Sequence, residues 1–127
     1  MKYKIRGKVR KHNQRGKKLG FPTANINISL AKNIPEGIYI SKAKIGNLIY
    51  PSVTFIGTAK TFDETRFHAE TYILDFNKNL YDKWITAELL KKIRANKKFA
   101  TIKQLIVQMK EDEKQARKYF SFHPLTS

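Results

Sequence analysis

The chain has 127 residues, of which 41% are hydrophobic, and this is enough for one domain with a true hydrophobic core. It contains no cysteine, which excludes disulfides and thiolate metal sites, and no apolar run approaches the roughly 18 residues of a membrane span. The N-terminal residues lack the apolar stretch of a signal peptide, so we expect a single soluble domain over residues 1–127, located in the cytoplasm.

The formal net charge of +16 indicates attraction to polyanions, either nucleic acids or small molecules such as ATP. Lysine makes up most of the basic residues, whereas arginine is the usual choice for specific phosphate and base contacts. The cations are also spread along the chain and form no block. We therefore do not expect nucleic-acid binding as the main function, although a basic nucleic-acid-binding barrel stays open as an alternative.

Residues 4–10 alternate apolar and basic side chains, which predicts a half-buried strand, and residues 12–18 read as a polar loop. The next stretch, residues 20–25, reads Gly-Phe-Pro-Thr-Ala-Asn. In an extended segment Thr23 and Asn25 would point to the same face, where their oxygens suit Mg²⁺ bound through substrate phosphates. A Gly-x-Pro-Thr string is also typical of a turn, so from these residues alone both interpretations stay open.

Residues 37–45 and 48–56 read as two strands that are joined by a hairpin turn at Gly46-Asn47. Pro51 lies within the second of them and indicates that this strand begins at a sheet edge or a bulge, because proline cannot donate to a ladder. Residues 60–65 are expected to form a loop.

Residues 67–76 show the clearest strand pattern, and Glu70 is a carboxylate in the middle of it. A general base for a hydroxyl is a proton acceptor held on a rigid element, which Glu70 would be. The alternative is a solvent-facing charge on the outer side of a barrel, and His68 and Tyr72 on the same face leave that alternative open. The histidines show no metal-ligand spacing, so we expect no transition-metal site.

Residues 80–93 are ambiguous, because their apolar positions fit both a helix and a strand. Arg94 follows and reads as a surface cation, although a guanidinium also offers planar, bidentate recognition. Residues 101–120 are predicted as a helix, since Thr101 and Gln104 form a capping-box pattern and apolar residues recur at helical spacing. Several antiparallel strands followed by one helix indicate a small β-barrel with the helix packed on it.

A series of motifs runs through nearly the whole chain in a definite order. The motifs are Gly7-x-Val9, Arg15-Gly16-Lys17-x-Leu19-Gly20-Phe21-Pro22-Thr23-Ala24-Asn25, Pro35-x-Gly37-Ile38-Tyr39, Ile56-Gly57-Thr58, Glu70-x-x-Ile73-Leu74-Asp75-Phe76-x-x-x-Leu80-Tyr81, Ile93-Arg94, Lys98-Phe99 and a helix containing Asp112. This series resembles the riboflavin kinase family of bacteria and eukaryotes, from about Ile5 to about Tyr119.

The resemblance implies a mainly β fold, a six-stranded antiparallel Greek-key barrel with a C-terminal α-helix, in which residues 84–93 form a strand. It implies a kinase that uses ATP and Mg²⁺ to phosphorylate the riboflavin 5′-hydroxyl, giving FMN. The family's catalytic residue falls on Glu70, and its metal ligands fall on Thr23 and Asn25. Its phosphate-binding positions fall on Arg15, Gly16, Lys17, Lys18, Gly20, Pro22 and Thr23, and its flavin-binding positions on Arg94, Phe99 and Asp112.

Several positions depart from the family pattern. They are His12 and Gln14 in place of glycines, Phe55 in place of an Asn, Lys60 in place of a Pro, Tyr72 in place of a His, and Asp82 in place of a Gly. These departures leave a second alternative open, a barrel that binds a flavin or nucleotide without turnover. Many bacterial members carry an N-terminal FMN adenylyltransferase domain, for which this chain has no room. We therefore expect a stand-alone, monomeric kinase that stops at FMN.

Overall fold

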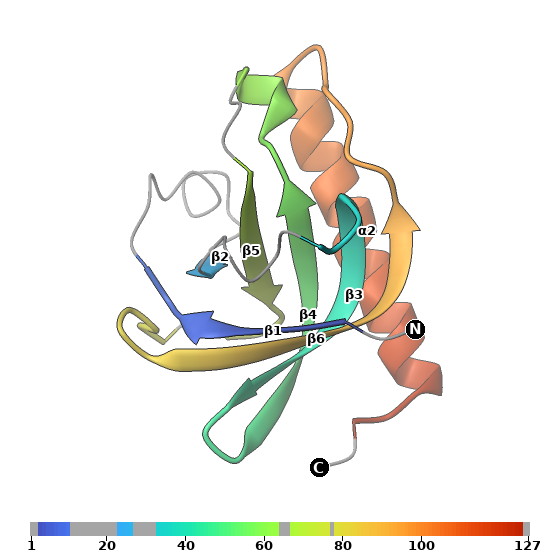
Figure 1. The fold of residues 1–127 in the computed structure, drawn as a ribbon. Coiled ribbons are helices and arrows are strands. Elements are labelled where there is room, and N and C mark those ends of the chain that lie inside the picture. The colour runs from blue at the N-terminus through green and yellow to red at the C-terminus, as the bar shows by residue number, and fades with distance from the viewer. Residues whose placement is uncertain (1–2, 11–22, 27–32, 64–66, 77, 126–127) are drawn as a thin grey trace.

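The computed structural model describes residues 3–10, 23–26, 33–63, 67–76 and 78–125 (Figure 1). Its elements are the strands β1 (Tyr3–Lys8), β2 (Thr23–Ile26), β3 (Gly37–Ile45), β4 (Leu48–Gly57), β5 (His68–Ile73) and β6 (Trp84–Arg94), the short 3₁₀ turn η2 (Lys60–Phe62) and the helix α2 (Ile102–Phe122). Within these described ranges, no helix combines the length and the apolar character needed to cross a membrane.

The six strands form one antiparallel sheet in the order β1-β6-β3-β4-β5-β2. Strands β3, β4 and β5 follow one another as a meander, and β6 returns to lie beside β3, which is the Greek-key arrangement. The sheet curls so that its two edges approach each other, and the backbone N–H of Arg10 donates to the Asn25 carbonyl at 2.9 Å across them (Figure 1). The predicted six-stranded antiparallel barrel with a C-terminal helix is therefore confirmed.

The predicted strands and helix are present, but several bounds differ: β1 ends at Lys8 instead of Arg10, β5 spans His68–Ile73 instead of 67–76, and α2 ends at Phe122 instead of Phe120. Strand β3 spans residues 37–45 as predicted, and β4 ends one residue later than predicted, at Gly57. Pro51 pairs with β3 and lies one residue before the ladder with β5, which begins at Ser52. Its carbonyl accepts a hydrogen bond from the Leu74 backbone N–H at 2.9 Å, so the proline lies at the margin of the β4–β5 ladder. The expected loop after β4 contains the 3₁₀ turn η2 instead of irregular chain alone.

The ambiguous segment is a strand, as the resemblance implies, and its interior positions alternate with outer ones. Ile85, Ala87 and Leu89 are fully buried inside the barrel, whereas Leu90 and Ile93 lie on the other face. Ile93 packs there against a second hydrophobic cluster, so the strand is apolar on both faces near its end. This two-sided burial explains why a helical spacing also fitted the sequence.

The interior of the barrel contains a chain of hydroxyl groups among its aliphatic side chains. The Ser41 hydroxyl lies 2.7 Å from that of Ser52 and 2.8 Å from that of Thr54, which in turn lies 2.9 Å from that of Thr71. All four side chains are completely buried. Since a buried hydroxyl without a partner is costly, each of these groups requires the others in place.

These hydroxyls specify the strand register. Ser41 and Ser52 are direct partners in the β3–β4 ladder, and Thr54 and Thr71 are direct partners in the β4–β5 ladder. A slip of one residue would turn every side chain of the slipped strand to the opposite face, and it would break the chain of hydrogen bonds. The register of β3, β4 and β5 is thus set from inside the barrel.

Helix α2 packs on the outer face of the same strands, as Figure 1 shows. Its N-cap is Thr101, whose side chain accepts a hydrogen bond from the Gln104 backbone N–H at 3.1 Å, as the capping-box pattern predicts. Near its other end, Arg117 donates to both carboxylate oxygens of Asp75 at 3.0 and 2.9 Å, and this pairing lowers the pKa of Asp75. The helix is therefore fastened to the end of β5.

Replacing Thr54 with Val is expected to destabilise the protein, because the change leaves two buried hydroxyls without a shared partner. We expect the free energy of unfolding to fall by about 1 to 3 kcal/mol, measured by urea denaturation. The matched control is Thr86→Val on the outer face of β6, where Thr86 is half-buried, and it should change stability by less than about 0.5 kcal/mol. Equal stability of the two variants would show that the hydroxyl chain does not hold the register.

Candidate active site

One row of side chains crosses the outer face of the sheet and joins residues that are far apart in sequence. The register pairs each member with the next across neighbouring strands, in the order Asn25, Glu70, Phe55, Ile38 and Arg94. Neighbouring strands lie about 4.8 Å apart, so three strand steps separate Glu70 from Arg94 by roughly 14 Å along the sheet. The row therefore has a polar group at each end and an apolar middle.

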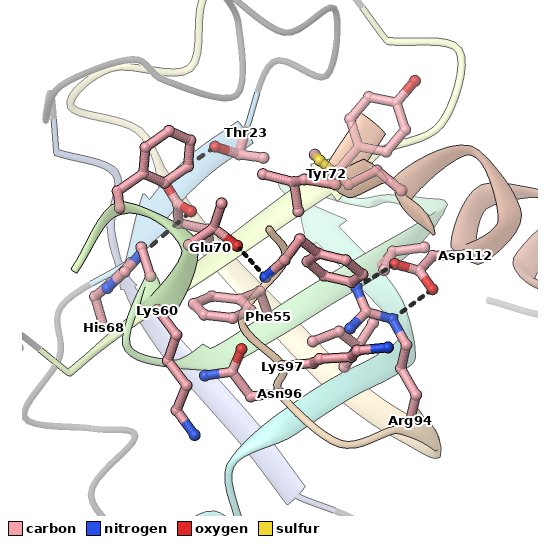
Figure 2. Close-up of a pocket in the computed structure, with 18 of the residues that line it drawn as sticks. Thr23, Phe55, Lys60, His68, Glu70, Tyr72, Arg94, Asn96, Lys97 and Asp112 are labelled. Atoms are coloured by element: carbon pink, nitrogen blue, oxygen red, sulfur yellow. Dashed lines mark hydrogen bonds and ion pairs between the residues drawn. The ribbon is translucent and has the colours of Figure 1, made fainter. Parts of the chain in front are cut away.

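A cavity of about 140 Å³ lies over this row, as Figure 2 shows. Its floor is the outer face of the sheet, and its walls come from the first half of α2, the turn η2 and the segment 94–99. The apolar side chains that line it are Ile38, Val53, Phe55, Phe62, Phe99, Leu105 and Met109. Such a lining suits a flat, largely apolar ring system with polar groups at its edges.

The carboxylate end of the cavity is built by Glu70 and its neighbours. Glu70 Oε1 accepts a hydrogen bond from the Thr23 hydroxyl at 3.3 Å, and His68 Nε2 lies 3.4 Å from Oε2 (Figure 2). Only 22% of the Glu70 side chain is exposed, and that side faces the cavity. Glu70 is thus a mostly buried carboxylate that faces the cavity, and not a solvated surface charge.

Thr23 and Asn25 lie in the strand β2, as the extended interpretation expects, whereas residues 20–22 of the motif lie outside the described residues. Asn25 is held on both sides by backbone pairing: to Glu70 on β5, and to Arg10 across the barrel seam, where the two edges of the sheet meet. Its amide is 7% exposed, and Nδ2 has no hydrogen-bond partner in the described part of the structure. A buried amide without a partner is costly unless a ligand satisfies it.

Thr23 also borders a second cavity, of about 410 Å³, on the far side of β2. The other described residues that line it are Val9, Ala24, Thr71, Ile73, Phe76, Lys78, Asn79, Leu80 and Tyr81. Thr23 therefore lines both cavities: the first, which Glu70 also lines, and the second, which Val9 and Ala24 also line. The predicted phosphate-binding residues Arg15, Gly16, Lys17, Lys18, Gly20 and Pro22 lie outside the described residues.

The guanidinium end of the cavity is a buried ion pair. Arg94 donates from Nε and Nη2 to the two carboxylate oxygens of Asp112, at 2.8 and 2.7 Å. The side chains are only 19% and 6% exposed, so the interpretation of Arg94 as a surface cation is wrong. Gln108 adds a third hydrogen bond to Asp112 at 3.0 Å, and the Arg94 guanidinium lies 5.8 Å from the centre of the Phe99 ring.

Two loop segments close the cavity from above, and sequence reasoning did not identify the polar groups that join them. Asn96 Nδ2 donates to the Thr58 carbonyl at 2.8 Å, and the Phe99 N–H donates to the Thr61 hydroxyl at 3.0 Å. Phe99 is thereby held over the apolar floor. These contacts join residues almost forty positions apart, so no local pattern could have indicated them.

Tyr72, one of the departures from the family pattern, lines the wall beside α2. Its hydroxyl donates to Glu113 Oε1 at 3.4 Å. Burial raises the pKa of Tyr72, and the neighbouring Glu113 carboxylate raises it further, so the phenol stays protonated at neutral pH.

Among the described residues, no group of three or more His, Cys, Asp or Glu side chains could hold a metal ion. A cation here would need ligands of another kind.

Comparison with known proteins points to one family. The family model described as flavokinase, riboflavin kinase, matches residues 1–120. A trifunctional protein RibF/MnmA of Mycoplasmoides gallisepticum is 38% identical over 91% of this chain and 18% of its own length. A bifunctional riboflavin kinase/FMN adenylyltransferase of Bacillus subtilis is 37% identical over 94% of this chain and 39% of its own length. The chain thus spans well under half of these curated relatives.

Solved structures show the same fold. A crystal structure of a Streptococcus pneumoniae protein described as a macrolide-efflux protein has a TM-score of 0.78 and 33% identity, over 90% of this chain and 38% of that chain. The riboflavin kinase of Trypanosoma brucei has a TM-score of 0.67 and 23% identity, over 94% of this chain and 80% of that chain. At this lower identity the second likeness shows the fold alone.

Replacing Asp112 with Asn is expected to destabilise the protein, because it leaves the mostly buried Arg94 guanidinium without a compensating charge. The free energy of unfolding should fall by about 3 kcal/mol, measured by urea denaturation. The control is Asp63→Asn, which removes a 79% exposed carboxylate paired with Lys98 and should cost less than about 1 kcal/mol. A loss at Asp112 no larger than the control would contradict a structural role for the pair.

Proposed function

Because the chain belongs to the riboflavin kinase family, we propose that it transfers the γ-phosphate of ATP to the 5′-hydroxyl of riboflavin, giving FMN and ADP. The observation that supports this most directly is the two-ended cavity. It has an apolar floor between Glu70 at one end and the Arg94–Asp112 pair at the other. An elongated substrate with a flat ring and a hydroxyl-bearing chain would span it.

In the proposed complex the isoalloxazine ring lies over the apolar floor, in contact with Phe55 and Phe99. The ribityl chain then runs toward Glu70 and brings its terminal hydroxyl to the carboxylate. Arg94 and Asp112 form a two-bond ion pair, and their proposed contribution is to hold the wall of α2 and Phe99 against the ring. Positioning of this kind supplies much of the rate in phosphoryl transfer.

The proposed reaction is a single in-line displacement. The riboflavin 5′-oxygen forms a bond to the γ-phosphorus while the bond between that phosphorus and the β,γ-bridging oxygen breaks, and ADP leaves with the electron pair. Glu70 accepts the hydroxyl proton as the new bond forms. The Thr23 hydroxyl binds one carboxylate oxygen, which limits the directions in which Glu70 can accept.

The chain's own residues fit Mg²⁺ at the carboxylate end. The Thr23 hydroxyl and the Asn25 side-chain carbonyl offer hard oxygen ligands on one strand face, while the unpaired Asn25 Nδ2 is a donor that a phosphate oxygen beside the metal would satisfy. When bound, Mg²⁺ would neutralise charge on the transferring phosphates, and it typically keeps waters and substrate oxygens as its remaining ligands. Thr23 and Asn25 are therefore the proposed metal ligands, with the second cavity beside Thr23 for the nucleotide.

The proposed unit is one kinase domain formed by residues 1–127, acting as a monomer in the cytoplasm, where ATP is available. The cations Arg15, Lys17 and Lys18, with Gly16, Gly20 and Pro22, are proposed to hold the nucleotide phosphates beside Thr23.

Incubation with riboflavin, ATP and Mg²⁺ should yield FMN and ADP in equal amounts, measured by chromatography with fluorescence detection. Chelation with EDTA should abolish the reaction, and added Mg²⁺ should restore it, because the phosphates carry charge that the protein residues neutralise only in part. Reactions without ATP or with riboflavin omitted are the controls. Absence of FMN with ATP and with every other nucleoside triphosphate would overturn the proposed function.

Glu70→Gln should lower kcat by about 10²- to 10⁴-fold, because the amide cannot accept the hydroxyl proton as the carboxylate does. The dissociation constant of riboflavin, measured by quenching of its fluorescence, should stay almost unchanged. Glu88→Gln is a matched control, since Glu88 on β6 has the same exposed fraction of 22% and pairs only with Lys4 at the surface. Retention of the full rate by Glu70→Gln would remove Glu70 from the mechanism.

A further inference from the structure

The carboxylate end of the cavity contains a buried histidine to which the proposed reaction assigns no chemical step. His68 lies two residues before Glu70 on β5, so both side chains point to the same outer face of the sheet. Only 3% of the His68 side chain is exposed. Histidine is seldom buried this completely without a specific polar partner, and here that partner is the carboxylate of Glu70.

The imidazole is held in place by an aromatic neighbour. The rings of Phe55 and His68 lie 5.2 Å apart between centroids and are tilted by 51°. Phe55 is also the direct register partner of Glu70 on β4, so one side chain contacts the histidine and borders the carboxylate. Figure 2 shows His68, Phe55 and Glu70 gathered at this end of the cavity.

The two oxygens of Glu70 are thus approached by groups from different strands. Oε1 accepts from the Thr23 hydroxyl of β2 at 3.3 Å, and Oε2 lies 3.4 Å from His68 Nε2. A glutamate side chain has several rotatable bonds, and a single contact would leave its carboxylate free to turn. Two contacts fix the carboxylate plane, which leaves the remaining lone pairs directed at the cavity.

We infer that His68 is a positioning residue for Glu70, which holds the carboxylate in the orientation that receives the proton of the substrate hydroxyl. This inference rests on the proposed function, and it assigns no substrate contact to His68. The competing explanation is that His68 only fills space beside Phe55. An apolar side chain would fill that space equally well but could not bind a carboxylate oxygen, so the two explanations predict different variants.

The first test compares His68→Leu with His68→Gln. Leucine keeps an apolar contact with Phe55 but removes the polar nitrogen, and kcat should fall by about 10- to 100-fold while riboflavin affinity is retained. Glutamine restores an amide nitrogen near the Nε2 position and should recover most of the rate. His123→Leu, at the exposed end of α2, is the control and should keep the full rate. Equal impairment of both His68 variants, or none, would overturn the inference.

The second test asks whether His68 acts through Glu70. In a Glu70→Gln background, His68→Leu should produce no further loss of kcat, because the group that it positions has already been removed. If kcat of the double variant fell by the product of the two single-variant losses, His68 would act independently of Glu70, and this would overturn the inference. Urea denaturation of each variant shows whether a loss of rate reflects unfolding.

A third measurement does not depend on turnover. Imidazole ¹⁵N chemical shifts in the NMR spectrum should change at His68 on Glu70→Gln and remain unchanged at His123. Unchanged His68 shifts would show that the two side chains do not interact and would overturn the inference even in an active enzyme. If the wild-type protein forms no FMN but the His68 shifts respond to Glu70→Gln, the proposed function fails while the contact between the two side chains stands.

Discussion

The strand register of the barrel is the constraint on which the rest of the structure depends. The hydroxyls of Ser41, Ser52, Thr54 and Thr71 lock this register from the inside, and the row from Asn25 to Arg94 uses it on the outside. If β5 slipped by one residue, Glu70 would turn into the hydrophobic interior, and Thr71 would face the cavity. The buried hydrogen bonds among these four hydroxyls therefore determine which side chains, Glu70 among them, face the cavity.

The two ends of the cavity are built from different kinds of structure. Strands alone hold Glu70, Thr23 and Asn25, so their relative positions follow from backbone pairing. The other end depends on side chains, because the Arg94–Asp112 pair fastens α2 to the end of β6. Phosphoryl transfer requires the most accurate placement where bonds change, and at that end backbone pairing sets the spacing of the groups.

The sequence was sufficient where a pattern is local. Strand-forming residues before a hairpin turn identified the strand 37–45, and a carboxylate within an apolar strand singled out Glu70. It was insufficient where the partner depends on tertiary packing: Arg94 read as a surface cation because Asp112 becomes its neighbour only when α2 docks. His68 was set aside for a similar reason, since the absence of metal-ligand spacing says nothing about a carboxylate on the same strand face.

The seam of the barrel lies at the proposed metal end, and this has a consequence for local opening. In the described part of the seam, one bridge, between Arg10 and Asn25, joins the two edges of the sheet. Fluctuations that separate these edges would move Asn25, together with its ladder partner Glu70, away from Arg10 before the interior core is disturbed, because interior packing opens last. A ligand that bound Thr23 and Asn25 on β2 and also contacted the β1 edge would act as a second fastening of the barrel, and the Arg10 amide would exchange its hydrogen more slowly.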